Sequence, residues 1–315
     1  TWDVTAAALT HLEGAPVALF PSGMAAIAAA MFATLKTGAR LLVPSDGYYA
    51  TRVLTATFLE RFGVTVEMRP TVSFSEGGFD GFDVVFIETP SNPGLDLIDI
   101  AEVSEAVRAE GGMTIVDNTT MTALGQRPLD LGAEVVVASD TKAPGGHSDL
   151  LMGHVACRDD DLLARVRDWR KFAGAIPGPM EAWLLHRGLE TLEVRFDRMC
   201  TSAEVIAGRL VAQPNVVSVR YPGLAEDPSH ALARAQMARC GFLIQVTFAG
   251  ADAAERFIDA CPLIQPATSF GGVHSSAERR IRWGDDVAPG VVRLSVGCEP
   301  VEELWAAMAN ALEAV

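Results

Sequence analysis

The sequence of 315 residues lacks long hydrophobic runs and paired cysteines. Charged or turn residues interrupt every apolar run before it reaches membrane-spanning length. The five cysteines are scattered and form no Cys-x-x-Cys pair, so we expect neither a disulfide framework nor a bound metal. The first residues show no signal-peptide pattern. These absences predict a protein of the reducing cytoplasm.

Positive charge is scarce as well. The chain has 25 lysines and arginines against 40 aspartates and glutamates, a formal net charge of -15. Such a surface repels phosphate backbones and anionic lipids, so we expect neither nucleic acid nor membrane as a partner. A small anion can still bind through local backbone amides. With 49% hydrophobic residues, the length predicts one large and one small domain, each with a buried core.

Short apolar runs alternate with helical patterns between about residues 15 and 157. The runs are rich in β-branched residues and lack polar alternation, as is typical of strands buried on both faces. They lie at residues 41–43, 64–66, 84–87, 113–116 and 135–137. Helical patterns lie between several of them, for example at 52–62 and 100–108. The alternation predicts an α/β fold with a mostly parallel sheet covered by helices.

The pattern changes after residue 157. Apolar residues at helical spacing predict a long helical region at 180–212. Further predicted strands and helices follow at residues 216–221, 242–248, 251–261, 291–296 and 301–312. This second part reads as a smaller α+β domain, so we expect a large domain over 1–195 and a small domain over 196–315.

Polar, turn-rich segments follow three successive predicted strands, at residues 88–93, 117–119 and 139–142. Ligands of open α/β sheets bind outside the carboxyl ends of the strands, so we expect one shared site there. Taken singly, each of the three segments is more simply explained as a turn that caps a strand or helix. Lys142 lies in a loop followed by Ala-Pro-Gly-Gly, where a partly apolar pocket would let its amine attack a carbonyl. A solvated loop lysine is the alternative.

Pyridoxal phosphate needs a lysine for a Schiff base, an acid on its pyridine nitrogen, a phosphate cradle and a stacking aromatic ring. Lys142 and Asp117 are candidates for the first two roles. Gly23, at the start of an apolar helical run, would let backbone amides meet the phosphate. Tyr48, after the strand at 41–43, would supply the aromatic ring. A plain helix cap by Ser22 and wall packing by Tyr48 are the alternatives.

These segments resemble the Cys/Met metabolism family of pyridoxal-phosphate enzymes over essentially the whole chain. The family includes cystathionine γ-lyase, γ-synthase and β-lyase, methionine γ-lyase and O-acetylhomoserine sulfhydrylase. The matching landmarks are residues 22–26, 88–93, 116–119, 139–142 with 145–149, 187–192, 221–224, 271–273 and 293–297. The resemblance implies the aminotransferase type I fold, with a mostly parallel seven-stranded sheet and a smaller C-terminal domain. It also implies a homotetramer, a dimer of dimers with shared active sites.

The resemblance also implies residue roles. Lys142 would carry the cofactor as a Schiff base, Asp117 would pair with the pyridine nitrogen, and Tyr48 would stack on the ring and help to transfer protons. Contacts with the phosphate and the ring hydroxyl would come from Ser22, Gly23, Met24, Asn92, Ser139 and Thr141. Substrate contacts would come from Arg293, Ser269 and His274.

Two departures from the family pattern concern the substrate. Ala50 stands where methionine γ-lyases typically have a cysteine, which counts against that activity. His274 stands where γ-lyases often have a glutamate associated with the distal amino group of cystathionine. Packing beside Trp283, or capping of the turn at 275–276, is the structural alternative for His274. We expect a carbon-sulfur lyase acting on a small sulfur amino acid, with cystathionine γ-lyase as the best single label.

Several alternatives stay open from the sequence. Cystathionine γ-synthase and O-acetylhomoserine sulfhydrylase, which catalyse γ-replacement, share every cofactor residue, and cystathionine β-lyase and methionine γ-lyase belong to the same family. A nucleotide-binding oxidoreductase would need a Gly-x-Gly-x-x-Gly turn after the first strand, which the sequence lacks. A non-catalytic regulator with the same fold is the last alternative, and the intact set of Lys142, Asp117 and Arg293 argues against it.

Overall fold

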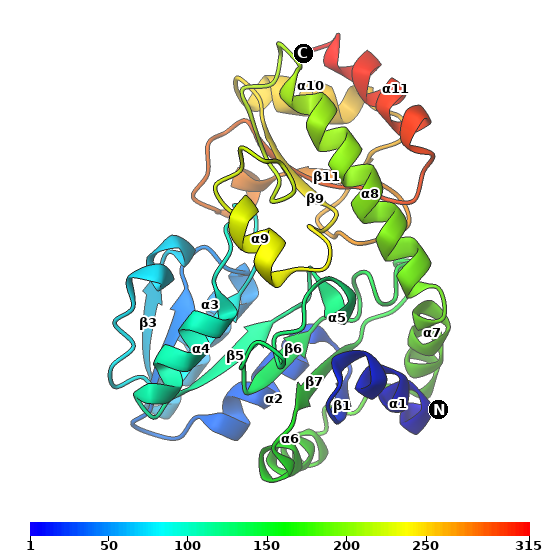
Figure 1. The fold of residues 1–315 in the computed structure, drawn as a ribbon. Coiled ribbons are helices and arrows are strands. Elements are labelled where there is room, and N and C mark those ends of the chain that lie inside the picture. The colour runs from blue at the N-terminus through cyan, green and yellow to red at the C-terminus, as the bar shows by residue number, and fades with distance from the viewer. The chain divides into compact units, whose positions relative to one another are not determined.

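The computed structural model of the protein describes residues 1–315, apart from the side chain of Trp283. The chain forms two compact units (Figure 1). The first comprises Thr1–Asn92 and Asp96–Glu190, and the second comprises Pro93–Leu95 and Thr191–Val315. Among the described residues, no helix is both long and apolar enough to cross a membrane.

The first unit is organised around a seven-stranded sheet with the order β1-β7-β6-β5-β4-β2-β3. Its strands are β1 (Val17–Phe20), β2 (Arg40–Pro44), β3 (Thr65–Arg69), β4 (Val84–Glu88), β5 (Met113–Asp117), β6 (Val135–Ala138) and β7 (Gly153–Cys157). Strands β2 to β6 are parallel to one another, whereas β7 runs antiparallel to β6 and β1. The expected α/β fold with a mostly parallel seven-stranded sheet is therefore confirmed.

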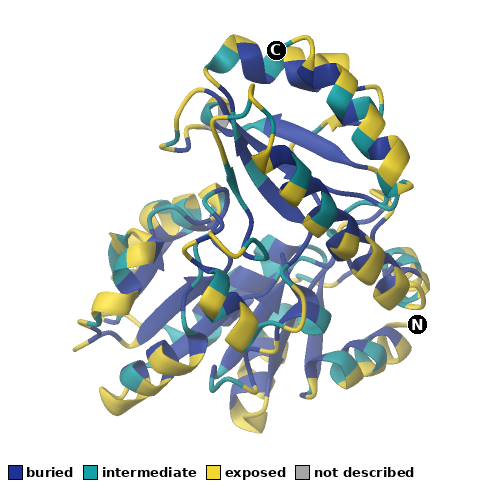
Figure 2. Cartoon of the chain, turned by 45° about the horizontal axis from the view of Figure 1, so that its top comes forward, coloured by how far each residue is buried: buried dark blue, intermediate teal, exposed yellow. Residues whose placement is uncertain are grey.

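The central strands are buried on both faces because neighbouring residues along each strand are apolar. In β4, Phe86 packs into a core with helices α2 (Gly23–Thr34) and α6 (Asp160–Phe172). The next residue, Ile87, points to the opposite face and packs into a second core with α4 (Ile100–Ala109). Figure 2 draws the strands of this sheet largely in the buried colour. Helices on both faces thus leave mainly the strand ends for a ligand.

Further helical elements complete the first unit. Helices α1 (Trp2–Glu13) and α7 (Pro179–Leu189) pack in a core with β1, and α5 (Thr122–Gly125) is a single turn. The helix predicted at 52–62 is instead α3 (Tyr49–Leu54) followed by a π-helical turn and a 3-10 turn. The Thr55 hydroxyl donates to the carbonyl of Arg52 at 2.9 Å, and such a bond competes with regular helical bonding.

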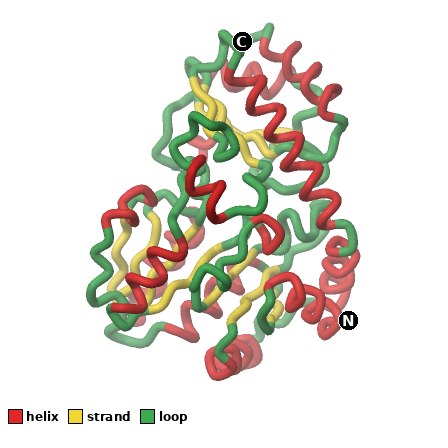
Figure 3. Tube along the Cα trace, viewed as in Figure 1, coloured by secondary structure: helices red, strands yellow, loops and turns green.

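The second unit contains a five-stranded sheet with the order β10-β11-β12-β9-β8 (Figure 3). Its strands are β8 (Ser218–Arg220), β9 (Leu243–Thr247), β10 (Gln265–Pro266), β11 (Ser276–Arg279) and β12 (Val291–Ser295). Its helices are α8 (Leu192–Val211), α9 (His230–Gln236), α10 (Ala251–Ala260) and α11 (Val301–Leu312). The core of the unit joins α8, α10 and α11 to the sheet. The expectation of a smaller α+β domain is confirmed.

The long helical region predicted at 180–212 is wrong as a single element. Helix α7 ends at Leu189, and α8 begins at Leu192 in the other unit. The apolar stripes of the two helices pack in different cores: Leu185 of α7 with β1 and α1, and Ile206 of α8 with the second sheet. Helical periodicity continues across the break, so the pattern alone did not reveal it.

Candidate active site

Strands β4, β5 and β6 end at one edge of the large sheet. Because the strands are parallel and in register, Glu88 at the end of β4 lies beside Asp117 at the end of β5, which in turn pairs with Val137 in β6. Ser139 follows β6 directly. The three polar segments predicted to share a site therefore begin at the same edge, as expected from the parallel topology.

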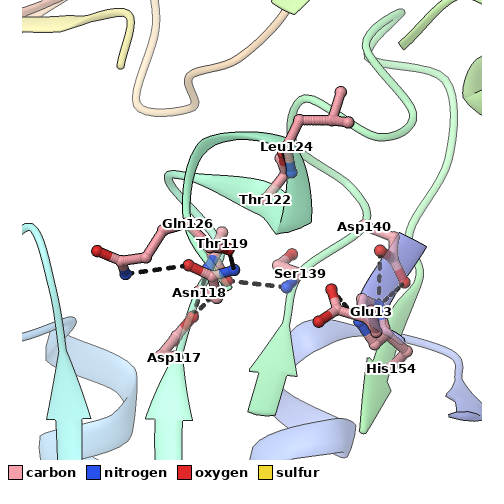
Figure 4. A network of polar contacts seen from close by, with 10 residues as sticks. All are labelled: Glu13, Asp117, Asn118, Thr119, Thr122, Leu124, Gln126, Ser139, Asp140 and His154. Carbon is pink, nitrogen blue, oxygen red and sulfur yellow. Dashed lines mark hydrogen bonds and ion pairs between the residues drawn. The ribbon is translucent and has the colours of Figure 1, made fainter. Parts of the chain in front are cut away.

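A chain of hydrogen bonds connects Asp117 with Ser139 (Figure 4). Oδ1 of Asp117 accepts from the backbone N–H of Thr119 at 3.0 Å and from its hydroxyl at 2.5 Å. The same hydroxyl oxygen accepts from the backbone N–H of Ser139 at 2.8 Å. Both bonds to Asp117 end on Oδ1, and among the described residues Oδ2 accepts none. The carboxylate is thus fixed in orientation, with one oxygen available to a protonated ring nitrogen.

Glu88 and Asp117 form a pair of buried carboxyl groups. Burial, together with the negative charge of Asp117, raises the pKa of Glu88 to about 8. Burial also raises the pKa of Asp117, against the lowering effect of its bonds from Thr119 and of the positive charges on Lys142 and His154. Two carboxyls this close do not both ionise readily, so at neutral pH the pair favours a shared proton or an added cation. A pyridinium nitrogen is such a cation.

Tyr48 is attached to this carboxyl pair through its backbone. Its N–H donates to Oε2 of Glu88 at 2.5 Å, and a Cβ on the preceding Gly47 would lie 2.9 Å from the same oxygen. The Tyr48 ring is partly exposed at the start of α3 and meets the Tyr49 ring edge-on, with centroids 5.1 Å apart. Glu88, to which the sequence analysis gave no role, therefore joins the Tyr48 loop to the Asp117 strand. The signal in the sequence was an acidic residue, Glu88, at the end of an otherwise apolar strand.

The start of α2 packs tightly against the loop after β6. Ser22 caps the helix, since its Oγ accepts from the backbone N–H of Ala25 at 3.1 Å. A Cβ added to Gly23 would lie 2.6 Å from Cβ of Ser139, and one added to Gly153 would lie 2.7 Å from the Gly23 nitrogen. Only glycine fits at both positions. The amides of the first helical turn, including that of the half-buried Met24, thus lie beside Ser139 in an arrangement suited to a phosphate.

Lys142 lies in a loop that backbone hydrogen bonds hold in place. Its N–H donates to the Ser139 carbonyl at 3.2 Å, and its carbonyl accepts from Gly146 at 2.8 Å. The backbone N–H and the hydroxyl of Thr141 both donate to the Met152 carbonyl at 3.2 Å. Lys142 is half-buried, whereas the other two lysines of the sequence are exposed. Lys142 is therefore the lysine best shielded from water in this sequence, as expected for a nucleophilic amine.

Asn92 follows β4 at the same edge of the large sheet. It is 5% exposed and comes after a cis peptide bond between Thr89 and Pro90. The neighbouring turn is closed by a bond from the Ser91 N–H to the Asp96 carbonyl at 2.8 Å and by one from the Asp96 N–H to Oγ of Ser91 at 3.1 Å. Asn92 therefore belongs to a well-defined turn that follows the same strand as Glu88.

The predicted substrate residues belong to the second unit. Arg293 is on β12 and is 3% exposed, and Ser269 and His274 lie in the segment between β10 and β11. Nη2 of Arg293 donates to the Thr268 carbonyl at 2.7 Å, and the guanidinium lies 4.9 Å from the Phe270 ring centroid. The cofactor residues of the first unit and these three residues are thus carried by different parts of the chain.

An acidic residue that the sequence analysis missed, Glu278, pairs with Arg293. Oε2 of Glu278 lies 3.2 Å from Nη2 of Arg293 and 2.5 Å from Nη1 of Arg280. Arg280 also pairs with Asp285 at 2.6 Å. Oε1 of Glu278 is buried and has no hydrogen-bond partner among the described residues. The alternation of side chains along β11 was the signal available in the sequence for Glu278. It places Glu278 on the same face of the strand as Ser276.

His274 is exposed and does not cap the following turn. That role belongs to Glu299, which accepts from the N–H of Ser275 at 2.6 Å and from its hydroxyl at 2.8 Å. The other structural alternative, packing beside Trp283, involves a side chain outside the described part of the chain. Ser269 is also exposed, and its carbonyl accepts from the Ser276 hydroxyl at 3.2 Å.

Comparison with known proteins identifies the family. The family model for Cys/Met metabolism PLP-dependent enzymes matches residues 1–313. The chain belongs to this family. The expected dependence on pyridoxal 5'-phosphate and the aminotransferase-type fold are confirmed with it. The lysine, the acid with a free oxygen and the glycine cradle all fit that cofactor, whereas no group of three metal-ligating side chains is found among the described residues.

Individual relatives support a carbon-sulfur lyase. A Streptomyces coelicolor protein, provisionally named cystathionine gamma-lyase, is 47% identical over 99% of this chain and 81% of its own length. An L-methionine gamma-lyase from Pseudomonas putida is 35% identical over 100% of this chain and 83% of its own. The structure of metB from Corynebacterium glutamicum has a TM-score of 0.93 at 36% identity, covering 97% of this chain and 83% of that one. The expectation of a PLP-dependent enzyme of this class is confirmed.

Proposed function

We propose that the protein is a cystathionine γ-lyase, which cleaves cystathionine to cysteine, 2-oxobutanoate and ammonia. The half-buried Lys142 beside a desolvated pair of carboxyls, Glu88 and Asp117, carries the proposed pyridoxal-phosphate chemistry. When bound, the cofactor withdraws negative charge from the α-carbon of an amino acid. The Streptomyces relative that bears this name supports the choice of substrate.

The residues of the first unit would bind the cofactor and move protons. Nζ of Lys142 would hold the cofactor covalently and would take the proton from the substrate α-carbon. Oδ2 of Asp117 holds the proton on the pyridine nitrogen, and the Tyr48 ring stacks on the cofactor. The Asn92 side chain bonds the ring hydroxyl. Ser22, Gly23, Met24, Ser139 and Thr141 hold the phosphate.

The residues of the second unit would bind the substrate. Arg293 clamps the substrate carboxylate with its planar guanidinium, and Ser269 and His274 contribute to recognition. This assigns cofactor binding to a large domain over 1–195 and substrate selection chiefly to a small domain over 196–315. Because Arg293 is already bonded to Glu278, the incoming carboxylate must compete for it.

Other members of the family remain candidates for the reaction. One solved structure of CalE6 from Micromonospora echinospora is described as a methionine gamma lyase and another as a cystathione gamma lyase, at 37% and 36% identity to this chain. Names within the family therefore separate substrates poorly. Ala50 stands against methionine as the substrate, and no residue of the first unit distinguishes γ-elimination from γ-replacement.

A side-by-side assay of the purified holoenzyme tests the proposal. Cystathionine, homocysteine, methionine and two O-acyl-homoserines with a thiol are each offered at equal concentration. We expect the highest kcat/KM for cystathionine, with 2-oxobutanoate and cysteine formed in equal amounts. A higher kcat/KM for an O-acyl-homoserine would make the enzyme a γ-replacement enzyme. Absence of a cofactor absorbance band and of all turnover would support a non-catalytic regulator.

We also propose that the chain assembles as a homotetramer with shared active sites. Large apolar side chains are exposed on the first unit, among them Leu151, Phe172, Met180 and Trp183, which are 51–79% exposed. Such residues are common in subunit interfaces. Light scattering during gel filtration would measure the assembly. A cytoplasmic location is supported by the five cysteines, all of which are free thiols.

A further inference from the structure

Three buried ionisable side chains, those of Glu13, Asp140 and His154, meet in one cluster (Figure 4). Nδ1 of His154, in β7, lies 2.9 Å and 3.0 Å from the two carboxylate oxygens of Asp140. Nε2 of the same ring lies 3.3 Å from Oε1 of Glu13, the last residue of α1. The three side chains are 4% exposed or less. None of the roles assigned above uses them.

We propose that Glu13, His154 and Asp140 form a clamp that holds the Lys142 loop in its reactive position. The clamp joins three elements: the end of α1, strand β7 and the loop that follows β6. Asp140 stands two residues before Lys142, and its carbonyl accepts from the N–H of Gly145 at 2.8 Å. The side chain of Asp140 is thus held by His154, and its backbone is held by a bond that spans Lys142.

The neighbouring bonds make the loop depend on the clamp. Thr141, between Asp140 and Lys142, bonds to Met152 two residues before His154. A Cβ on Gly145 would lie 3.0 Å from the Asp140 carbonyl, so the backbone has little room to shift. Displacing Asp140 would therefore move Lys142. Small displacements matter, since about 1 Å of misplacement can cost on the order of a hundredfold in rate.

The His154 ring carries a positive charge in this setting. Each ring nitrogen faces a carboxylate, so both donate, as only the imidazolium can. Desolvation lowers the pKa of His154, but Asp140 and Glu13 raise it more, to about 10. The other charged groups nearby are Asp117, whose pKa the His154 charge lowers, and Arg127, which lies beside Gly14. Arg127 itself pairs with Asp130 at 2.8 Å.

Replacing His154 alone should lower kcat more than replacing His154 and Asp140 together. In His154→Asn, Glu13 and Asp140 face each other as buried carboxyls without a counter-charge. In the double variant Asp140→Asn with His154→Asn, that repulsion is gone. His11→Asn is the matched control, because His11 is exposed on the same helix as Glu13. Glu13→Gln is the mildest variant, because it keeps a hydrogen-bond acceptor and removes one charge.

Four quantities are measured on each holoenzyme: kcat, KM for cystathionine, the thermal midpoint, and the pH at which the cofactor absorbance band changes. The inference rests on the proposed role of Lys142. In His154→Asn we expect kcat to fall at least about tenfold with a smaller change in KM, and the absorbance midpoint to move. The double variant should regain part of kcat. In Glu13→Gln the alkaline loss of kcat should begin at lower pH, because His154 loses one anionic partner.

A purely structural role predicts another pattern. A lower thermal midpoint in His154→Asn, with kcat and the absorbance midpoint as in the wild type, overturns the proposal. If His154→Asn does not fold, unchanged values in both Glu13→Gln and Asp140→Asn overturn it as well. Failure of the proposed function would look different, since the wild type and His11→Asn would then turn over cystathionine poorly while the absorbance midpoint still moved in His154→Asn.

Discussion

The two units bury charge in opposite ways. At the strand ends of the first unit, Glu88 and Asp117 lie side by side, and burial raises both of their pKa values. In the second unit, Arg280 and Arg293 are bonded to Glu278, and Arg280 is bonded to Asp285 as well. The first cluster has an excess of buried acid, whereas the second pairs two cations with two anions.

This difference suggests distinct energetic roles for the two clusters. A buried pair of carboxyls gains from any cation placed beside it, so the first cluster is prepared for the protonated ring of a cofactor. The balanced cluster gains less from a new anion, because the substrate carboxylate that we propose Arg293 binds would have to compete with Glu278. We therefore expect cofactor binding to be tight and substrate binding to be weaker and selective.

The largest expected effect comes from removing the amine that faces the acidic cluster. Lys142→Ala should abolish turnover, because the other two lysines of the chain, Lys36 and Lys171, are exposed. Borohydride reduction of the wild type followed by peptide mapping should place the pyridoxyl group on Lys142. Lys171→Ala serves as the control and should keep full activity. A pyridoxyl group on either of the other lysines would end the assignment.

The next effect concerns the charge of the acidic cluster itself. Asp117→Asn removes the carboxylate that we propose holds the pyridine nitrogen protonated. The barrier to α-proton removal should therefore rise by more than about 2 kcal/mol. Single-turnover kinetics with cystathionine would measure this step. Asp149→Asn, in an exposed position after the Lys142 loop, is the control. Near-normal rates in Asp117→Asn would contradict the role of this acid.

A smaller effect tests the proton held by the acidic cluster. The pKa of Glu88 is raised to about 8 in the folded protein, so between about pH 4.5 and pH 8 the folded chain retains a proton that the unfolded chain releases. Glu88 therefore destabilises the fold increasingly as pH rises through this window. In the cofactor-free protein, Glu88→Gln should gain stability over the wild type from pH 4.5 to pH 8, by at least about 2 °C in thermal midpoint at pH 8.

Thermal scans at several pH values would measure this, with the exposed Glu60→Gln as the control. A stability difference that stays constant between pH 5 and pH 8 would show that Glu88 is ionised like an ordinary surface acid. The excess of buried acid in the first cluster would then not distinguish it from the charge-balanced second cluster.

The smallest effect lies at the exposed rim of the second unit. His274→Glu should raise kcat/KM for cystathionine relative to an O-acyl-homoserine, because a carboxylate attracts the distal ammonium of cystathionine. Competition assays from pH 6 to pH 8 would measure the ratio. An unchanged ratio in the variant at every pH would leave His274 without a part in selection.

The sequence by itself determined the strands and the main catalytic candidates. Runs such as residues 84–87 are apolar at successive positions, which only a strand covered on both faces can bury. Lys142, Asp117 and Gly23 were identified because their chemistry is visible in the residue type and its place after or before an apolar run. Their geometry follows from parallel strands that end together.

Tertiary structure alone decided the electrostatic partners. His154 and Glu13 are 141 positions apart in the chain, and their contact depends on how α1 meets β7. The acid beside Asp117 and the acid beside Arg293 are set by strand register, which residue types do not reveal. The break between α7 and α8 likewise depends on which core each apolar stripe enters. Periodicity and motifs are local, whereas burial and charge pairing act through space between distant segments.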